Sequence, residues 1–279
     1  MKLKTIAILS AIVVFLAFFY WPTFRWLGHS WLSNPYYSHG FLVPLVSGFF
    51  VWTKRAELKR GEPSIIGAYA VALGAFVYIM GFVWGIRFLS ALSLLIVLGS
   101  LVLLLYGTKT ARSMVFPLCF LIFMIPLPFM QELGFHLQSI STDSSAWLLG
   151  VVGLSVTTVG PEIHVGDTVF TVGLPCSGIN TLIALLALAA VYAYLLMGPL
   201  YKRVILFVIA FPIAILANIF RITAIISVAN NHGTDVAMGF FHDLSSVLFF
   251  LLAFLCLVLL GRLLRCRLRV LVLRRLRWN

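Results

Sequence analysis

Charged residues are scarce in this chain of 279 residues, where Asp, Glu, Lys and Arg together make up only 10%. A soluble domain normally carries about 25% charged residues, so this composition cannot cover a mostly water-facing surface. Acidic residues are the scarcest, with 8 Asp and Glu against 20 Lys and Arg, while hydrophobic residues reach 62%. The composition excludes an ordinary soluble domain and predicts a protein embedded in a lipid bilayer.

The formal net charge of +12 does not indicate a nucleic-acid partner, because the basic residues sit at the ends of apolar runs. Arginines crowd the last stretch, residues 262–279, which is typical of a cytoplasmic segment facing anionic lipid. We therefore expect the lipid bilayer as a partner, no nucleic acid, and a basic cytoplasmic tail over residues 262–279.

Eight apolar runs approach the roughly 20 residues that a membrane-crossing helix needs. They cover residues 5–21, 36–52, 65–86, 88–106, 113–130, 179–197, 204–229 and 244–261. The first run lacks a small-residue cleavage site after it, so we interpret it as a retained helix rather than a signal peptide. The predicted fold class is an all-α polytopic membrane protein of about eight transmembrane helices.

The distribution of basic residues predicts the orientation of these helices. With eight spans and the N-terminus inside, only Arg25, Arg87 and Arg221 of the 20 Lys and Arg fall outside or at the outer boundary. Because lysine and arginine concentrate in cytoplasmic loops, we expect a multi-pass protein of the cytoplasmic (inner) cell membrane with both termini in the cytoplasm.

Residues 131–175 interrupt the pattern of spans and are expected on the outer face. Residues 131–149 predict an amphipathic helix lying on the membrane. Further on, residues 156–172 are rich in Val and Thr, and the pair Gly166-Asp167 lies between residues 162–165 and 168–170, which predicts a small β-hairpin. We expect this extracytoplasmic insertion between helices five and six of a single domain, residues 1–279.

Cysteine is the second scarcity, with 4 residues in the chain. The predicted topology leaves Cys176 alone on the outer side, without a disulfide partner there, which flags it as a reactive thiol or an intermolecular link. It lies just before helix six, where free N–H groups and partial positive charge favour a thiolate and an oxyanion. The alternative is an inert cysteine packed at a helix cap.

Arg221 and His242 are expected at the same outer level. A guanidinium inside a span is costly and usually functional or paired, although it also snorkels to lipid headgroups. Asn218 precedes Arg221 by about one helical turn and shares its face. His242 just before helix eight suits general acid–base chemistry, or it is a structural interfacial histidine, and the adjacent Asp243 is expected to cap that helix.

Together these residues supply a thiol nucleophile, a base and a stabiliser for negative charge, which thiol catalysis needs. None of the 6 histidines shows HExxH or a comparably tight ligand spacing. We therefore expect neither a metal site nor a cofactor.

At these residues the sequence resembles the exosortase/archaeosortase family. The matching motifs are Pro-Cys-Ser-Gly-Ile at 175–179, Ala-Asn-Ile-Phe-Arg-Ile at 217–222, Phe-Phe-His-Asp at 240–243, Tyr-Ser-His-Gly-Phe-Leu-Val-Pro at 37–44, Pro-Leu-Pro at 126–128 and Gly-Pro-Glu-Ile at 160–163. The resemblance covers about residues 30–262. Each motif is short, but their order, spacing and membrane placement are specific in combination.

The resemblance implies a membrane cysteine protease or transpeptidase with Cys176 as nucleophile, His242 as general acid/base and Arg221 as oxyanion stabiliser or thiolate partner. Residues in supporting or substrate-binding positions are Asn218, Ser177, Gly178 and His39. Implied partners are membrane-anchored proteins with a C-terminal sorting signal of PEP-CTERM type: a short motif, an apolar helix and a basic tail. The alternative function is a polytopic transporter, or an assembly factor for polysaccharide export, without covalent catalysis.

Overall fold

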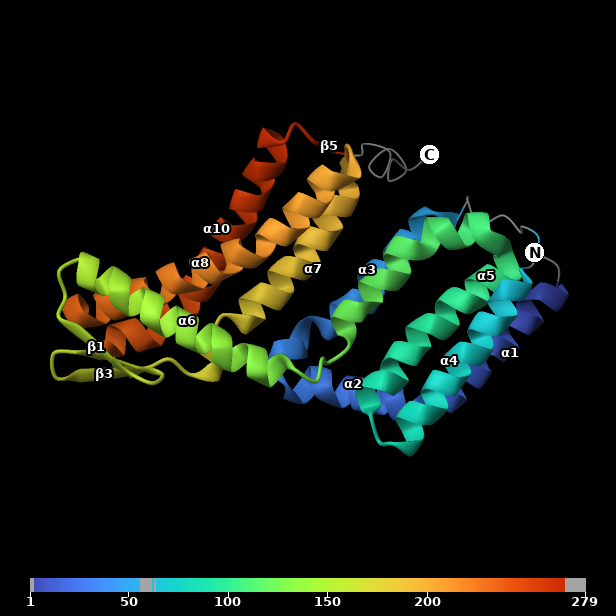
Figure 1. The fold of residues 1–279 in the computed structure, drawn as a ribbon, viewed down its shortest axis with the longest axis horizontal. Coiled ribbons are helices and arrows are strands. Elements are labelled where there is room, and N and C mark those ends of the chain that lie inside the picture. Colours follow the sequence, from blue (N-terminus) through green and yellow to red (C-terminus); the bar gives the residue numbers. More distant parts are fainter. Residues whose placement is uncertain (1–2, 56–61, 63, 269–279) are drawn as a thin grey trace. The chain divides into compact units, whose positions relative to one another are not determined.

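The computed structural model describes residues 3–55, 62 and 64–268 of the protein, and these residues are mostly helical (Figure 1). They form two compact units, Met1–Pro128 and Phe129–Asn279. Each unit has buried apolar side chains of its own. The expectation of a single domain over residues 1–279 stays a prediction.

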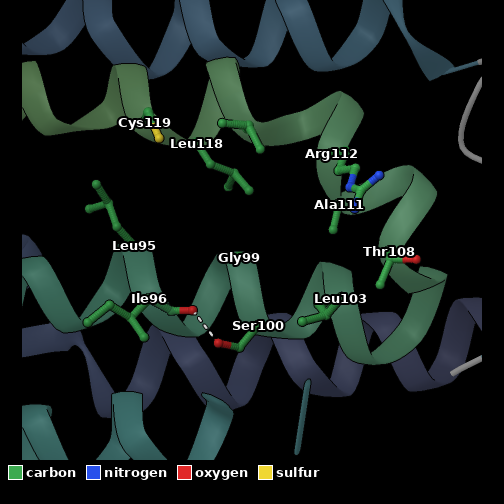
Figure 2. A pocket seen from close by; sticks show the side chains of 11 residues that line it. Leu95, Ile96, Gly99, Ser100, Leu103, Thr108, Ala111, Arg112, Leu118 and Cys119 are labelled. Atoms are coloured by element: carbon green, nitrogen blue, oxygen red, sulfur yellow. Dashed lines mark hydrogen bonds between the residues drawn. The ribbon is translucent and has the colours of Figure 1, made fainter. Parts of the chain in front are cut away.

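The described residues of the first unit are mainly helical. Its elements are α1 (Leu3–Phe19), α2 (Trp21–Ser33), η1 (Pro35–Phe41), α3 (Leu42–Thr53), α4 (Ile65–Val83), α5 (Arg87–Phe120) and η3 (Leu121–Met124). Helix α5 breaks at Gly107, whose φ of 77° and ψ of 178° are not helical. Figure 2 shows its two arms side by side, with Leu95 and Cys119 at one end and Thr108 near the turn, and a cavity of about 480 Å³ lies between them.

Small residues let α4 pack closely against α5. Gly67, Gly74 and Gly81 recur at intervals of two helical turns on one face of α4, and all three are buried. A Cβ atom on Gly67 would lie 2.6 Å from the backbone of Leu104, and one on Gly81 would lie 2.7 Å from the backbone of Ser90. Small residues at such positions are typical of helix pairs inside membranes, where backbones approach each other.

Four described helices are long and apolar enough to cross a membrane: Ile65–Val83, Arg87–Met124, Leu200–His232 and His242–Leu263. A fifth span results if Ser10–Phe19 and Trp21–Ser33, which meet at 69°, are counted as one. By helix length and composition, the described residues contain fewer candidate spans than the eight that the sequence predicted. Two of the eight predicted spans form the two arms of α5. Of the predicted span 36–52, only the 12 residues of α3 lie in an α-helix. The predicted span 179–197 contains α7 (Ile179–Leu195), which has 17 residues.

The reason for the short α3 is local. Residues 35–41 form a 3-10 turn instead of continuing the helix, with Pro35 at its start and the side chain of Asn34 accepting a hydrogen bond from the N–H of Tyr36. Tyr37 and Gly40 of this turn are buried. Because proline and glycine interrupt this apolar run, its first part forms a packed turn and only the second part forms an α-helix.

The second unit surrounds the long helix α8 (Leu200–His232). Its other elements are α6 (Met130–Val151), β1 (Val156–Val159), β2 (Glu162–Val165), β3 (Thr168–Thr171), η4 (Leu174–Cys176), α7, β4 (Leu196–Met197), α9 (Thr234–Val236), η5 (Ala237–Phe241), α10 (His242–Leu263) and β5 (Arg267–Leu268). In Figure 1, α7, α8 and α10 lie side by side, and α6 runs along α8.

Between α6 and α7 the chain forms three strands rather than the two of the expected hairpin. The sheet order is β1-β2-β3 and both pairs are antiparallel, with Gly166 and Asp167 in the turn between β2 and β3. Ile163 of the central strand is fully buried and packs in one cluster with Leu149 of α6 and Ile222 of α8. The helix α6 occupies the stretch where an amphipathic helix was expected.

The beginning of the expected basic tail folds back on the second unit. Leu196 and Met197 after α7 pair with Leu268 and Arg267 in a short antiparallel ladder. The rest of the tail, residues 269–279, lies outside the described residues.

Candidate active site

Cys176 lies in the short segment between the sheet and α7. It ends the 3-10 turn η4, and its N–H donates to the carbonyl of Gly173 at 2.8 Å. Helix α7 begins at Ile179 with Gly178 as its N-cap. The thiol therefore precedes the N-terminus of a helix, as the sequence predicted, where the unpaired N–H groups favour negative charge.

Gly178 and Asn218 hold this segment against α8. Gly178 has a φ of +89°, and a Cβ atom there would lie 2.7 Å from the side-chain carbon Cγ of Asn218. Asn218 is 2% exposed, and its Nδ2 donates to the carbonyl of Cys176 at 3.0 Å and to Oγ of Ser141 at 3.1 Å. Only glycine at position 178 permits both the left-handed backbone and this close approach.

His242 begins α10 directly after the π-helical turn η5. Its Nε2 lies 3.7 Å from Sγ of Cys176, and its Nδ1 lies 3.4 Å from Oδ1 of Asp243. The hydroxyls of Ser245 and Ser246 donate to its backbone carbonyl at 2.9 and 3.0 Å. The expectation that Asp243 caps α10 is wrong, because the N-cap is Phe241 without a side-chain hydrogen bond and the Asp243 carboxylate contacts the imidazole instead.

Arg221 reaches the same place from α8, although it is only 8% exposed. Its Nη2 lies 3.2 Å from Nε2 of His242, and its Nε donates to Oγ of Ser245 at 3.4 Å. A guanidinium can only donate, so Nε2 of His242 is the acceptor and the proton of the neutral ring is on Nδ1, toward Asp243.

The buried charge of Arg221 has no carboxylate ion-pair partner within the described ranges. Removing a guanidinium from water is costly unless an anion or several acceptors replace the solvent. The sulfur of Cys176 contacts the same imidazole, so a thiolate or the oxyanion of an attacked carbonyl would balance the charge of Arg221. The arrangement thus brings a thiol, an imidazole and a guanidinium to one point, and these are the groups that thiol catalysis needs.

The structure also locates the expected supporting residues. Ser177 is 1% exposed, and its carbonyl accepts a hydrogen bond from Oγ of Ser141 at 3.4 Å, so it faces the protein interior. His39 belongs to the first unit, where its Nε2 lies 3.2 Å from the carbonyl oxygen of Phe123.

Sequence reasoning missed the serines that support the site. Ser141 and Ser145 are buried on α6, where they contact Asn218 and the carbonyl of Ile219, and Ser245 links Arg221 to the first turn of α10. The signal for Ser141 and Ser145 was the stretch of small polar residues within 139–145 in an otherwise apolar chain. In the described part of the chain, no group of three His, Cys, Asp or Glu residues could hold a metal ion.

Comparison with known proteins gives one match. The family model of the transmembrane exosortase (Exosortase_EpsH) matches residues 31–259, which include Cys176, Arg221 and His242. No curated protein and no solved structure matches the chain.

Proposed function

Because the chain belongs to the transmembrane exosortase family, we propose that it is a membrane-embedded cysteine protease or transpeptidase acting on C-terminal sorting signals of PEP-CTERM type. Cys176 is the nucleophile, His242 the general acid/base and Arg221 the stabiliser of negative charge. The observation that carries this proposal is the contact of His242 Nε2 with both Cys176 Sγ and Arg221 Nη2, at 3.7 and 3.2 Å.

The reaction begins with proton transfer from the thiol of Cys176 to Nε2 of His242. The thiolate attacks the scissile carbonyl carbon, and Arg221, until then directed at Nε2, turns its donors to the oxyanion. The tetrahedral intermediate collapses with cleavage of the C–N bond, and His242 gives its proton to the leaving amine. A thioester between substrate and Cys176 remains.

A second nucleophile completes the cycle. Water or an amine attacks the thioester while His242 accepts a proton from it and then returns that proton to the sulfur of Cys176. Water gives hydrolysis, whereas an amine gives transfer of the substrate to another carrier. The contact of Nδ1 with Asp243 keeps the ring in the tautomer that this sequence of steps needs.

The proposal extends to the placement in the membrane. We propose about eight spans with both termini in the cytoplasm, which sets the active site at the outer face of the inner membrane. Substrates are exported proteins whose apolar signal helix enters from the lipid. The basis is the distribution of Lys and Arg along the sequence together with the four to five candidate spans.

The test uses a secreted reporter that ends in a Pro-Glu-Pro motif, an apolar helix and a basic tail, expressed in cells together with this protein. Cys176→Ala should abolish cleavage while the protein level in the membrane stays the same. Cys256→Ala is the matched control, because Cys256 is a free, exposed cysteine on α10 outside the site. Normal cleavage by Cys176→Ala would favour the transporter or assembly role instead.

A further inference from the structure

A cavity of about 380 Å³ borders the candidate active site, and Cys176 and His242 are among its lining residues. Its other lining residues include 169–171 of β3, Val172 just after this strand, Ile222 and Ile225 of α8, and Met238 of η5. Among the residues that the structure describes, Cys176 and His242 are the ionisable side chains that line the space. Such a cavity favours an uncharged and mainly apolar group, because a charge would lose its hydration there.

Strand β3 is an edge strand of the sheet, since the strand order in the described part of the chain is β1-β2-β3. The N–H of Val172, just after β3, donates to the carbonyl of Pro161 at 2.9 Å and so points toward β2. Backbone direction alternates along an antiparallel strand, so Phe170 also bonds toward β2. Val169 and Thr171 therefore direct their N–H and C=O groups toward the open edge.

The open edge and the cavity coincide. Val169 and Thr171 both line the cavity, and both are exposed. The end of β3 is fixed from outside the sheet, because the side-chain amide of Gln138 on α6 donates to the carbonyl of Val172. A molecule that reaches the sulfur of Cys176 through this cavity thus meets backbone groups of Val169 and Thr171 that pair with no other strand of the described sheet.

We propose that the substrate segment next to the scissile bond binds as an extended strand along the open edge of β3, with one apolar side chain in the cavity. This inference rests on the proposed function, because it assigns the cavity to the molecule that Cys176 attacks. Main-chain hydrogen bonds from an added strand provide affinity, and a pocket for alternate side chains provides selectivity.

An extended segment also fits the chemistry better than a helical one. A helix bonds its own N–H and C=O groups, which shields the scissile carbonyl from the thiol and leaves the edge of β3 unpaired. A strand leaves every second backbone group free and turns alternate side chains to opposite sides. The sorting signal must therefore unwind where it leaves its apolar helix.

Substitution with proline tests the strand pairing. Val169→Pro removes one outward N–H and spares the bonds to β2, so reporter cleavage should fall by about fivefold to tenfold, the effect of one backbone hydrogen bond. Thr158→Pro is the matched control, because Thr158 pairs with Ile163, whose backbone bonds are used toward Phe170 of β3. Thr158 therefore directs its N–H to the outer edge of β1, away from the cavity, and its proline variant should cleave normally.

The geometry is tested by cross-linking in cells. All four native cysteines are replaced by alanine, Thr171→Cys is added, and single cysteines are walked along the reporter on both sides of the cleavage site. A strand gives disulfides at every second reporter position, whereas a helix gives a repeat of three to four positions. A helical repeat, or no cross-link at any position, would overturn the proposal.

Failure of this inference is distinguishable from failure of the proposed function. If Cys176→Ala abolishes cleavage but Val169→Pro cleaves like the wild type, the strand pairing is wrong and the cysteine mechanism stands. If Cys176→Ala still cleaves the reporter, both the strand pairing and the cysteine mechanism are wrong. Alkylation of Cys176 by a small reagent should be equal in wild type and Val169→Pro, which shows that the proline spares the thiol.

Discussion

The imidazole of His242 lies 3.7 Å from the sulfur of Cys176 although 66 residues separate them along the chain. The same ring nitrogen is 3.2 Å from the guanidinium of Arg221. Three helices meet at this nitrogen, since Cys176 precedes α7, Arg221 belongs to α8 and His242 begins α10.

Replacing His242 by glutamine should lower reporter cleavage by about a hundredfold or more, because an amide cannot accept the thiol proton at neutral pH. The rate of Cys176 alkylation at pH 7 should fall as well. Both are measured on membranes that contain equal amounts of protein. The control His232→Gln changes an exposed histidine at the end of α8 and should cleave normally. Equal rates for the two variants would exclude His242 as the base.

Arg221→Lys should reduce cleavage by about tenfold or more while the protein stays folded. Arginine donates to His242 Nε2 and Ser245 Oγ from two separate nitrogens of one rigid plane. The single nitrogen of a lysine side chain cannot reproduce this spacing of donors. The reporter assay is repeated with Arg262→Lys, an exposed arginine near the end of α10. If Arg221→Lys cleaves the reporter like the wild type, a positive charge is sufficient and the planar arrangement of guanidinium donors is not needed.

Gly178→Ala should destabilise the second unit by about 1–3 kcal/mol, because alanine resists a positive φ and its methyl group would overlap Asn218. Thermal unfolding of the purified protein in detergent measures the effect. The control Gly150→Ala lies in the helix α6 with no atom within 4 Å of the added Cβ, so it should be neutral or slightly stabilising. An unchanged unfolding temperature for Gly178→Ala would contradict the close packing on Asn218.

The sequence was sufficient for features that depend on composition and local pattern. A low content of charge and long apolar runs predicted a polytopic helical protein, and the family model confirms the resemblance to exosortases. The number of spans was harder to predict from the sequence. Whether an apolar run becomes one long helix, a broken one such as α5 or a packed turn such as Pro35–Phe41 depends on contacts with other segments.

What the sequence by itself determined is the set of candidate residues: an isolated thiol before a helix, an arginine within an apolar helix and a histidine at a helix start. Only the tertiary structure decided that they meet, that Asp243 contacts the imidazole instead of capping α10, and that the edge of β3 borders the same cavity. The physical reason is range. Hydropathy and capping act within a few residues, whereas hydrogen bonds across 66 positions exist only once packed helices bring the side chains together.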